Sequence, residues 1–386
     1  MNQVNRIIST YSADVFGAIS ALFELGGMIV VHDPSGCNST YTTHDEPRWF
    51  NSKTLLYISA LTEMDAVLGN DARFIKDVTE TALLQKPKFI ALIPAQMPAM
   101  LGIDMNGIAK IVEKNTGIKT FALNTTSMQD YSVGISFAFS KIAEIIVNDT
   151  KNPCPVSKRE GVNILGLTPL DFALNDTDKS IVKFFEENKY PVISTFAMNT
   201  NLENLQNAHN AACNIVVSNG GLKAAKIFEA AWNTPYIVGL PIGSMKKNIL
   251  QALNKNKTSV AYDLKAKNFK NNKKIYLIHE SVIAASIATA LEAAMDNKIT
   301  VVNMTEPSFI REGDLIFQNE AELEKIFNSA DIIIADPMYK PIISKNIQFI
   351  SLPHVAFSGR TYRKSMLNLT DDFGKIVDKI LCHILS

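Results

Sequence analysis

Short apolar runs alternate with helix-length segments along almost the whole chain, and this alternation restricts the accessible folds more than any other feature. Apolar runs of this length, bounded by turn residues or charge, are typical of strands buried in a parallel sheet. They lie at residues 28–31, 54–58, 89–93, 120–123, 162–167, 214–217, 236–240, 275–278, 300–303 and 331–335, with helix-length segments at 71–85, 107–115, 180–188, 221–231, 281–295 and 320–329. The pattern predicts an α/β fold of repeated, Rossmann-like, doubly wound parallel sheets.

Two linker-like segments divide the chain. Its 386 residues exceed what one hydrophobic core usually organises. Residues 148–161 are polar and contain two prolines, and residues 254–274 are rich in lysine and asparagine. We therefore expect an N-terminal domain at 1–155, a middle domain at 156–272 and a third domain at 273–349. An amphipathic helix at 370–385 is expected to return to the first domain, so that residues 350–386 complete it.

Charge and hydropathy exclude two classes of partner. Lysine plus arginine equal aspartate plus glutamate at 38 each, so no overall positive field attracts nucleic acid. No stretch reaches the roughly 18 apolar residues that span a bilayer, and no basic leader precedes an apolar segment. We expect a cytoplasmic protein without a nucleic-acid or membrane partner.

Four cysteines, Cys37, Cys154, Cys213 and Cys382, lie far apart in the sequence. They form neither the dense pattern of a secreted disulfide scaffold nor a C-x-x-C knuckle. Any metal site must therefore be assembled by the fold or by a second chain.

Cys37 has the most suggestive position of the four. The apolar run 28–31 leads directly into His32-Asp33-Pro34-Ser35-Gly36-Cys37. A turn at the carboxyl end of a parallel strand borders the crevice where α/β proteins bind ligands. The alternative is that Cys37 is a small buried hydrophobe, as most isolated cysteines are.

Several motifs together resemble the N-terminal domain of nitrogenase component 1 subunits. They are Gly17-Ala18-Ile19-Ser20, the turn ending at Cys37, and Thr62-Glu63-Met64-Asp65-Ala66-Val67-Leu68-Gly69-Asn70-Asp71. In that family the cysteine of this turn ligates an iron–sulfur cluster between two subunits. The resemblance implies the same role for Cys37, and thiolates suit such clusters because soft sulfur donors stabilise iron.

Other cluster ligands of that family are missing. Residues 94–104 look like the family's next cluster loop, but they contain no cysteine. One thiol cannot hold a four-iron cluster alone. The resemblance therefore implies an iron–sulfur cluster, [4Fe-4S] by analogy, that is shared in a homodimer or in a heterodimer with a paralogous component 1 subunit.

Residues 213–222 and 235–244 resemble the segments that border the family's metal cofactor. The cofactor-ligating cysteine of true nitrogenases falls at Ser218, and serine is a poor iron ligand at neutral pH. We expect no nitrogenase iron–molybdenum cofactor and no dinitrogen reduction. Ser218 stays a cofactor-binding candidate by this resemblance. Gly243, in Gly243-Ser244-Met245-Lys246-Lys247, is another because free amides at a helix N-terminus hold anions, although the segment matches no Walker or dinucleotide motif.

Two histidines are candidates for proton transfer. His354 lies in a segment, 352–360, that resembles the family's segment reaching the active cavity, with Ser358 and Arg360 as further cofactor-binding candidates. His354 would ligate metal or donate a proton; the alternative is a loop histidine fixed by a backbone hydrogen bond. His44 belongs to a polar cluster at 41–49 that either relays protons or is a solvated loop.

These implications favour an oxidoreductase subunit that accepts electrons from a separate ATP-binding iron protein and reduces an unknown small molecule. The resemblance places the docking face of that iron protein near residues 63–71. A tetrapyrrole reductase, a non-catalytic scaffold for cluster or cofactor assembly, and a small-molecule binding protein that has lost its cluster remain alternatives.

Overall fold

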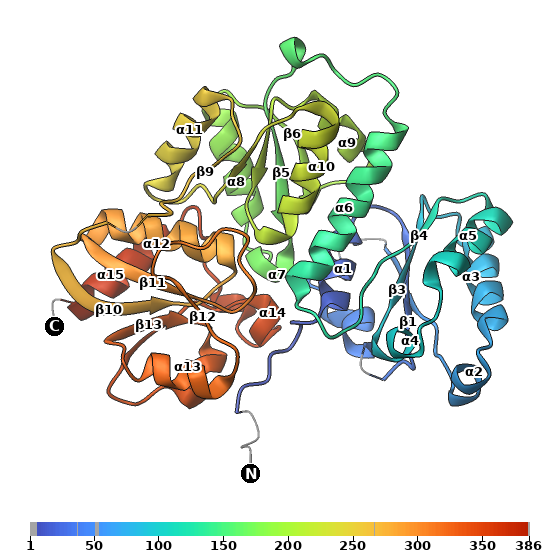
Figure 1. Ribbon diagram of the computed structural model, residues 1–386, viewed down its shortest axis with the longest axis horizontal. Coiled ribbons are helices and arrows are strands. Elements are labelled where there is room, and N and C mark those ends of the chain that lie inside the picture. Colours follow the sequence, from blue (N-terminus) through green and yellow to red (C-terminus); the bar gives the residue numbers. More distant parts are fainter. Residues whose placement is uncertain (1–5, 37, 51–53, 266, 385–386) are drawn as a thin grey trace.

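Three parallel β-sheets, each flanked by helices, make up the computed structural model (Figure 1). The structure describes residues 6–384 except 37, 51–53 and 266, and leaves out the side chains of residues 43, 44 and 382–384. The sheets lie within residues 28–122, 162–260 and 271–351. This architecture confirms the predicted fold class of repeated, doubly wound parallel sheets.

The first sheet has the order β2-β1-β3-β4 and is parallel throughout. Its strands are β1 (Met28–His32), β2 (Leu55–Ile58), β3 (Ile90–Pro94) and β4 (Thr120–Ala122). β1 is buried along its whole length because successive side chains enter two different cores. Met28 and Val30 pack with α3 (Asp71–Gln85) and α5 (Met105–Thr116), whereas Ile29 and Val31 face the core that contains α1 (Asp14–Leu22).

The second and third sheets each have five parallel strands. The second has the order β6-β5-β7-β8-β9, with strands β5 (Val162–Leu167), β6 (Val192–Ala197), β7 (Cys213–Val216), β8 (Tyr236–Val238) and β9 (Ser259–Val260). The third has the order β12-β11-β10-β13-β14, with strands β10 (Asn271–Leu277), β11 (Asn297–Asn303), β12 (Leu315–Ile316), β13 (Ile332–Ala335) and β14 (Gln348–Ser351). The domain limits stay a prediction; β10 and β14 extend across the expected limits at 273 and 349.

A long helix, α6 (Tyr131–Asp149), lies between the first two sheets and packs against α1 and α10 (Leu222–Trp232) (Figure 1). Glycines allow the closest approach. A Cβ at Gly17 would lie 1.9 Å from the carbonyl oxygen of Tyr131, and a Cβ at Gly134 would lie 1.8 Å from that of Asp14. α1 and α6 therefore contact each other through their backbones.

The remaining helices flank the sheets or close the loops at their carboxyl edges. They are α2 (Glu63–Leu68), α4 (Gln96–Leu101), α7 (Pro169–Phe172), α8 (Thr177–Glu187), α9 (Leu202–Gln206), α11 (Met245–Lys255), α12 (Ser281–Met295), α13 (Glu320–Phe327), α14 (Val355–Ser358), α15 (Phe373–Ile384) and a π-helical turn, η1 (Tyr41–Asp45). Short 3₁₀ turns occupy Val156–Lys158, Asn207–Asn210, Asn219–Gly221, Pro337–Ile342 and Arg363–Ser365.

The expected return of the C-terminal helix to the first domain is wrong. α15 packs on α12 and β14 of the third sheet, and the Phe373 ring lies beside Gly243. The apolar stripe of α15 is covered by the third sheet, which is closer in sequence than the first domain. The segment before the helix does return: the backbone amides of Thr10 and Tyr11 donate to the carbonyls of Phe357 and Ala356.

None of the described helices is both long enough and apolar enough to span a lipid bilayer.

Candidate functional site

Polar side chains from the ends of several strands meet where the three sheets come together. Asp171 lies in α7 just after β5, His279 follows β10, and His354 follows β14 at the start of α14. Tyr131 opens α6. All four side chains are at most 6% exposed. Ligands bind at the carboxyl ends of the strands in such folds, so this buried cluster occupies the expected location of a site.

Tyr131, Asp171 and His354 form a hydrogen-bonded triad. The Tyr131 hydroxyl donates to Asp171 Oδ1 at 2.6 Å, and His354 Nε2 lies 3.1 Å from the same oxygen and 3.3 Å from the tyrosine oxygen. With the Nε2 proton in place, the Asp171 carboxylate accepts from both partners. A proton on one member therefore has a direct route to the other two.

The backbone of His354 is held by the third sheet. Asp336, which follows β13, accepts from the His354 amide at 2.7 Å and from the Ser358 hydroxyl at 2.8 Å. The imidazole also packs edge-on against His279, with 4.5 Å between ring centroids. The histidine is thus fixed at its backbone by one carboxylate and at its ring by another.

Burial controls the ionisation of the groups around the triad. Burial, followed by the charge of Asp171, raises the pKa of Tyr131 well above its ordinary value. The same two causes raise the pKa of Glu280 to about 7. Burial, followed by the proximity of His354, lowers the pKa of His279 well below its ordinary value. The cluster therefore favours a neutral phenol and a neutral His279 ring.

Ser218 and His354, the two residues that the resemblance places beside a metal cofactor, are already bonded to protein groups. Ser218 is fully buried after β7, and its hydroxyl donates to the carbonyl of Gly166 at 2.7 Å. His354 Nε2 is occupied by Asp171, with the fully buried ring of Tyr131 beside it, whereas His354 Nδ1 has no hydrogen-bond partner among the described residues. Among the described residues, no group of three or more histidine, cysteine, aspartate or glutamate side chains is placed to hold a metal ion. The engaged hydroxyl of Ser218 does not fit the ligand position of a large metal cofactor.

The other cofactor-binding candidates have structural contacts of their own. The ring of Phe373 and the methyl of Ala290 cover Gly243. Arg360 is largely exposed and pairs with Asp45 at 2.9 Å. Asp45 also accepts from the hydroxyl of Tyr11 at 2.5 Å. The segment that carries His354 is thereby tied to the loop that follows the cysteine turn.

The cysteine turn lies at the carboxyl end of β1. Cys37 and the side chain of His44 lie outside the described residues, so their predicted roles remain predictions. Pro34, Ser35 and Gly36 are exposed, and a Cβ at Gly36 would meet no heavy atom within 4 Å.

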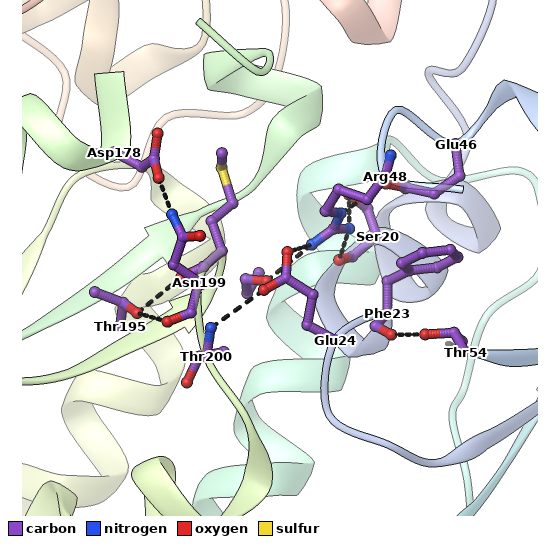
Figure 2. Close-up of polar contacts among 12 residues, drawn as sticks. Ser20, Phe23, Glu24, Glu46, Arg48, Thr54, Asp178, Thr195, Asn199 and Thr200 are labelled. Carbon is purple, nitrogen blue, oxygen red and sulfur yellow. Dashed lines mark hydrogen bonds and ion pairs between the residues drawn. The ribbon is translucent and has the colours of Figure 1, made fainter. Parts of the chain in front are cut away.

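The cysteine loop, residues 38–48 after the cysteine turn, is fixed at its end to the second sheet by a buried arginine (Figure 2). Arg48 pairs with Glu46 at 2.7 Å and with Glu24 at 3.2 Å, and it donates to the carbonyls of Ser20 and Ala197 at 2.7 and 2.8 Å. Figure 2 also shows Glu24 accepting from the amide of Thr200, which follows β6. Arg48 therefore anchors the loop to the second sheet. Asp45 anchors it to Arg360, in the segment that follows β14 of the third sheet.

Sequence reasoning missed most of the triad's surroundings. Tyr131, Asp171, Asp336, His279 and Glu280 were not candidates, although four of them come directly after a strand or within four residues of its end. Polar residues at the carboxyl ends of parallel strands were therefore an available signal. Tyr131 had no such signal, because its helix was not expected.

Comparison with known proteins shows the family. The family model for nitrogenase component 1 type oxidoreductases matches residues 14–337. The chain belongs to this family. Two curated proteins are similar to this chain. One is the nitrogenase iron-molybdenum cofactor biosynthesis protein NifE of Clostridium pasteurianum, 23% identical over 214 residues, which covers 54% of this chain and 45% of the relative.

The other relative is the nitrogenase molybdenum-iron protein alpha chain of Methanosarcina barkeri, 21% identical over 236 residues. That match covers 58% of this chain and 42% of the relative, so the similarity spans less than half the length of either curated relative. Among solved structures, "Nitrogenase Cp1 at pH 6.5" superposes with a TM-score of 0.71 at 18% identity, covering 100% of this chain and 94% of that chain. This likeness shows a shared component 1 fold.

Proposed function

We propose that this chain is an electron-accepting oxidoreductase subunit of the component 1 type. In this proposal a separate ATP-dependent iron protein delivers electrons to an iron–sulfur cluster that Cys37 shares with a second chain, and a small organic molecule is reduced. The observation that carries the proposal is the buried triad of Tyr131, Asp171 and His354. Reduction of an organic molecule requires protons as well as electrons, and the triad is built to hold and pass them.

The connection between the triad and the cysteine loop supports this assignment. Arg360, six residues after His354, pairs with Asp45, eight residues after Cys37. A bound cluster would supply one-electron chemistry at that loop. The protein's own contribution is to hold the loop rigidly and to keep Tyr131 and His354 hydrogen-bonded to one carboxylate.

An exposed apolar surface offers a docking site for the iron protein. It consists of residues on α2 and α4, at the same edge of the first sheet as the cysteine turn: Met64, Val67, Leu68, Met97, Met100 and Leu101, exposed by 44–82%. Between the two helices lies a cavity of about 420 Å³ that Asp65, Asp71 and Asp104 help to line. Apolar patches of this kind mark interaction surfaces, and the acidic cavity favours a partner that presents a basic side chain.

A second candidate function is a scaffold for cluster assembly, which the similarity to NifE favours. The hydrogen bond that Ser218 donates to the Gly166 carbonyl argues against a scaffold for a large metal cofactor, since this hydroxyl is already engaged. A scaffold for a smaller cluster at Cys37 would leave the triad without a role.

Iron and sulfide content would test the proposal. Anaerobically prepared wild-type protein is expected to contain both, Cys37→Ala is expected to lose most of them, and Cys154→Ala, a half-buried free thiol elsewhere, is expected to keep them. Addition of an iron protein with ATP should then reduce the cluster. Equal iron in wild type and Cys37→Ala would refute the assignment of the cluster. Release of the cluster to an acceptor protein, without its reduction by the iron protein, would favour the scaffold.

A further inference from the structure

A second cavity, of about 420 Å³, lies between the first and third sheets and shares a wall with the triad. Residues 7–13, the start of α6, and the loops after β11 and β12 enclose it. Tyr131 and Phe357 both line it. On its other side, Tyr131 bonds to Asp171, and the Phe357 ring lies 5.7 Å from that of His354. A molecule in this cavity would be separated from Asp171 and His354 by one layer of aromatic side chains, formed by Tyr131 and Phe357.

The walls combine aromatic rings with an unused hydroxyl. Tyr339 and Phe357 stack with 5.7 Å between centroids, and Phe317 adds a third ring. Thr305 is 7% exposed, and its hydroxyl has no hydrogen-bond partner among the described residues. Buried polar groups are normally bonded, and an unpaired one costs free energy. The hydroxyl of Thr305 is therefore an unpaired hydrogen-bonding group within the wall of the cavity.

The charge around the cavity is negative. Asp130 and Glu320 line it, and none of the described residues that line it is a lysine or an arginine. The nearby Arg6 is shared between Glu320 and Glu324, at 3.1 and 2.6 Å, so one negative charge in that group is not balanced. Negative potential beside aromatic faces favours an organic cation and disfavours a carboxylate or phosphate.

We infer that this cavity binds a small organic amine, with its apolar body against Tyr339 and Phe357 and its ammonium group bonded to the hydroxyl of Thr305. The volume is that of an ordinary small-molecule site. The inference goes beyond the proposed function and does not depend on it, because binding needs neither a cluster nor an iron protein.

Three probes that share one ring system separate the contribution of the ammonium group to binding from that of the apolar ring. The full-length protein is titrated with 2-naphthylmethylamine, 2-naphthylmethanol and 2-naphthoate by isothermal calorimetry. We expect the amine to bind several-fold more tightly than the alcohol and at least tenfold more tightly than the carboxylate. Equal affinity for the amine and the alcohol, tighter binding of the carboxylate, or no binding of any probe would overturn the inference.

Two matched variants locate the binding. Thr305→Val removes the unpaired hydroxyl without changing the shape of the side chain, and it is expected to weaken amine binding about fivefold. Thr370→Val removes another buried hydroxyl without a partner, outside the cavity, and should leave the affinity unchanged. Because neither hydroxyl is bonded, both variants should melt like the wild type. An unchanged affinity in Thr305→Val would contradict the assigned contact.

Discussion

Gly17 of α1 lies directly against the backbone of Tyr131 in α6, so close that a Cβ at Gly17 would be 1.9 Å from the Tyr131 carbonyl oxygen. This contact joins the N-terminal helix to the residue that opens α6 and belongs to the buried triad. It also places Tyr131 between α1 on one side and Asp171 on the other.

The Gly17 contact predicts a large effect of a single methyl group. Gly17→Ala should lower the free energy of unfolding by about 3 kcal/mol or more, because the obstructing atoms belong to a helix backbone that cannot rotate away. Gly374→Ala, also within a helix but with no neighbour within 4 Å, should change stability by no more than about 1 kcal/mol. Urea titration of both variants measures the difference. Equal stabilities would show that α1 and α6 are not so closely packed.

Arg48 should be far more important for stability than its exposed counterparts. Arg48→Met leaves the fully buried carboxylate of Glu46 without its cation, which is expected to cost about 3–5 kcal/mol. Arg73→Met breaks the ion pair of a half-exposed arginine with Asp65, and it should cost about 1 kcal/mol or less. In the double variant Arg48→Met/Glu46→Gln part of the loss should be recovered. A small effect of Arg48→Met alone would contradict the buried network.

His32 should make the fold sensitive to moderate acid. Burial lowers the pKa of His32 from 6.5 to about 4, and its Nδ1 lies 2.7 Å from the Ser59 hydroxyl. As the pH falls below about 6.5, the unfolded chain binds a proton that the folded chain rejects, so stability is lost down to about pH 4. The loss attributable to His32 is about 3 kcal/mol. Comparing the stability of His32→Gln with the wild type at pH 7 and pH 4.5 isolates it; the variant should lose less.

Leu68 should contribute to docking of the iron protein and little to folding. Its side chain is 69% exposed on the surface formed by α2 and α4. Leu68→Ser is expected to weaken binding of the iron protein at least tenfold while the melting temperature stays unchanged. Leu84→Ser, at a 77% exposed leucine of α3 outside that surface, serves as the control. Biolayer interferometry under anaerobic conditions would detect the difference, and similar affinities for both variants would exclude this surface.

Most of the strands and helices were predictable from their pattern of apolar residues. Strands buried on both faces appear as continuous apolar runs, and helices buried on one face show an apolar stripe. The expected segments 71–85 and 281–295 coincide with α3 and α12, and 162–167 coincides with β5. α6 was missed. Ten of its residues, including Ser132 and Gly134, are buried between α1 and α10, and a helix covered on several sides lacks an amphipathic stripe.

The candidate site was only partly predictable for a related reason. His354 and Ser218 were found through the resemblance, but nothing in the local sequence indicates that Asp171 meets His354 from 183 residues away. Asp171 lies in a short apolar segment, Pro169–Phe172, that looks like core. Such contacts depend on how the sheets are placed against each other, which periodicity alone does not determine.

The hydrogen bonds from Thr10 and Tyr11 to Phe357 and Ala356 determine when the N-terminal segment can fold during synthesis. On the ribosome, residues 10 and 11 emerge well over three hundred residues before the carbonyls that they bond. The N-terminal segment cannot take its final place until residues 356 and 357 have been synthesised. The triad has the same requirement, because His354 is synthesised 223 residues after Tyr131 and the two side chains can meet only when both are present.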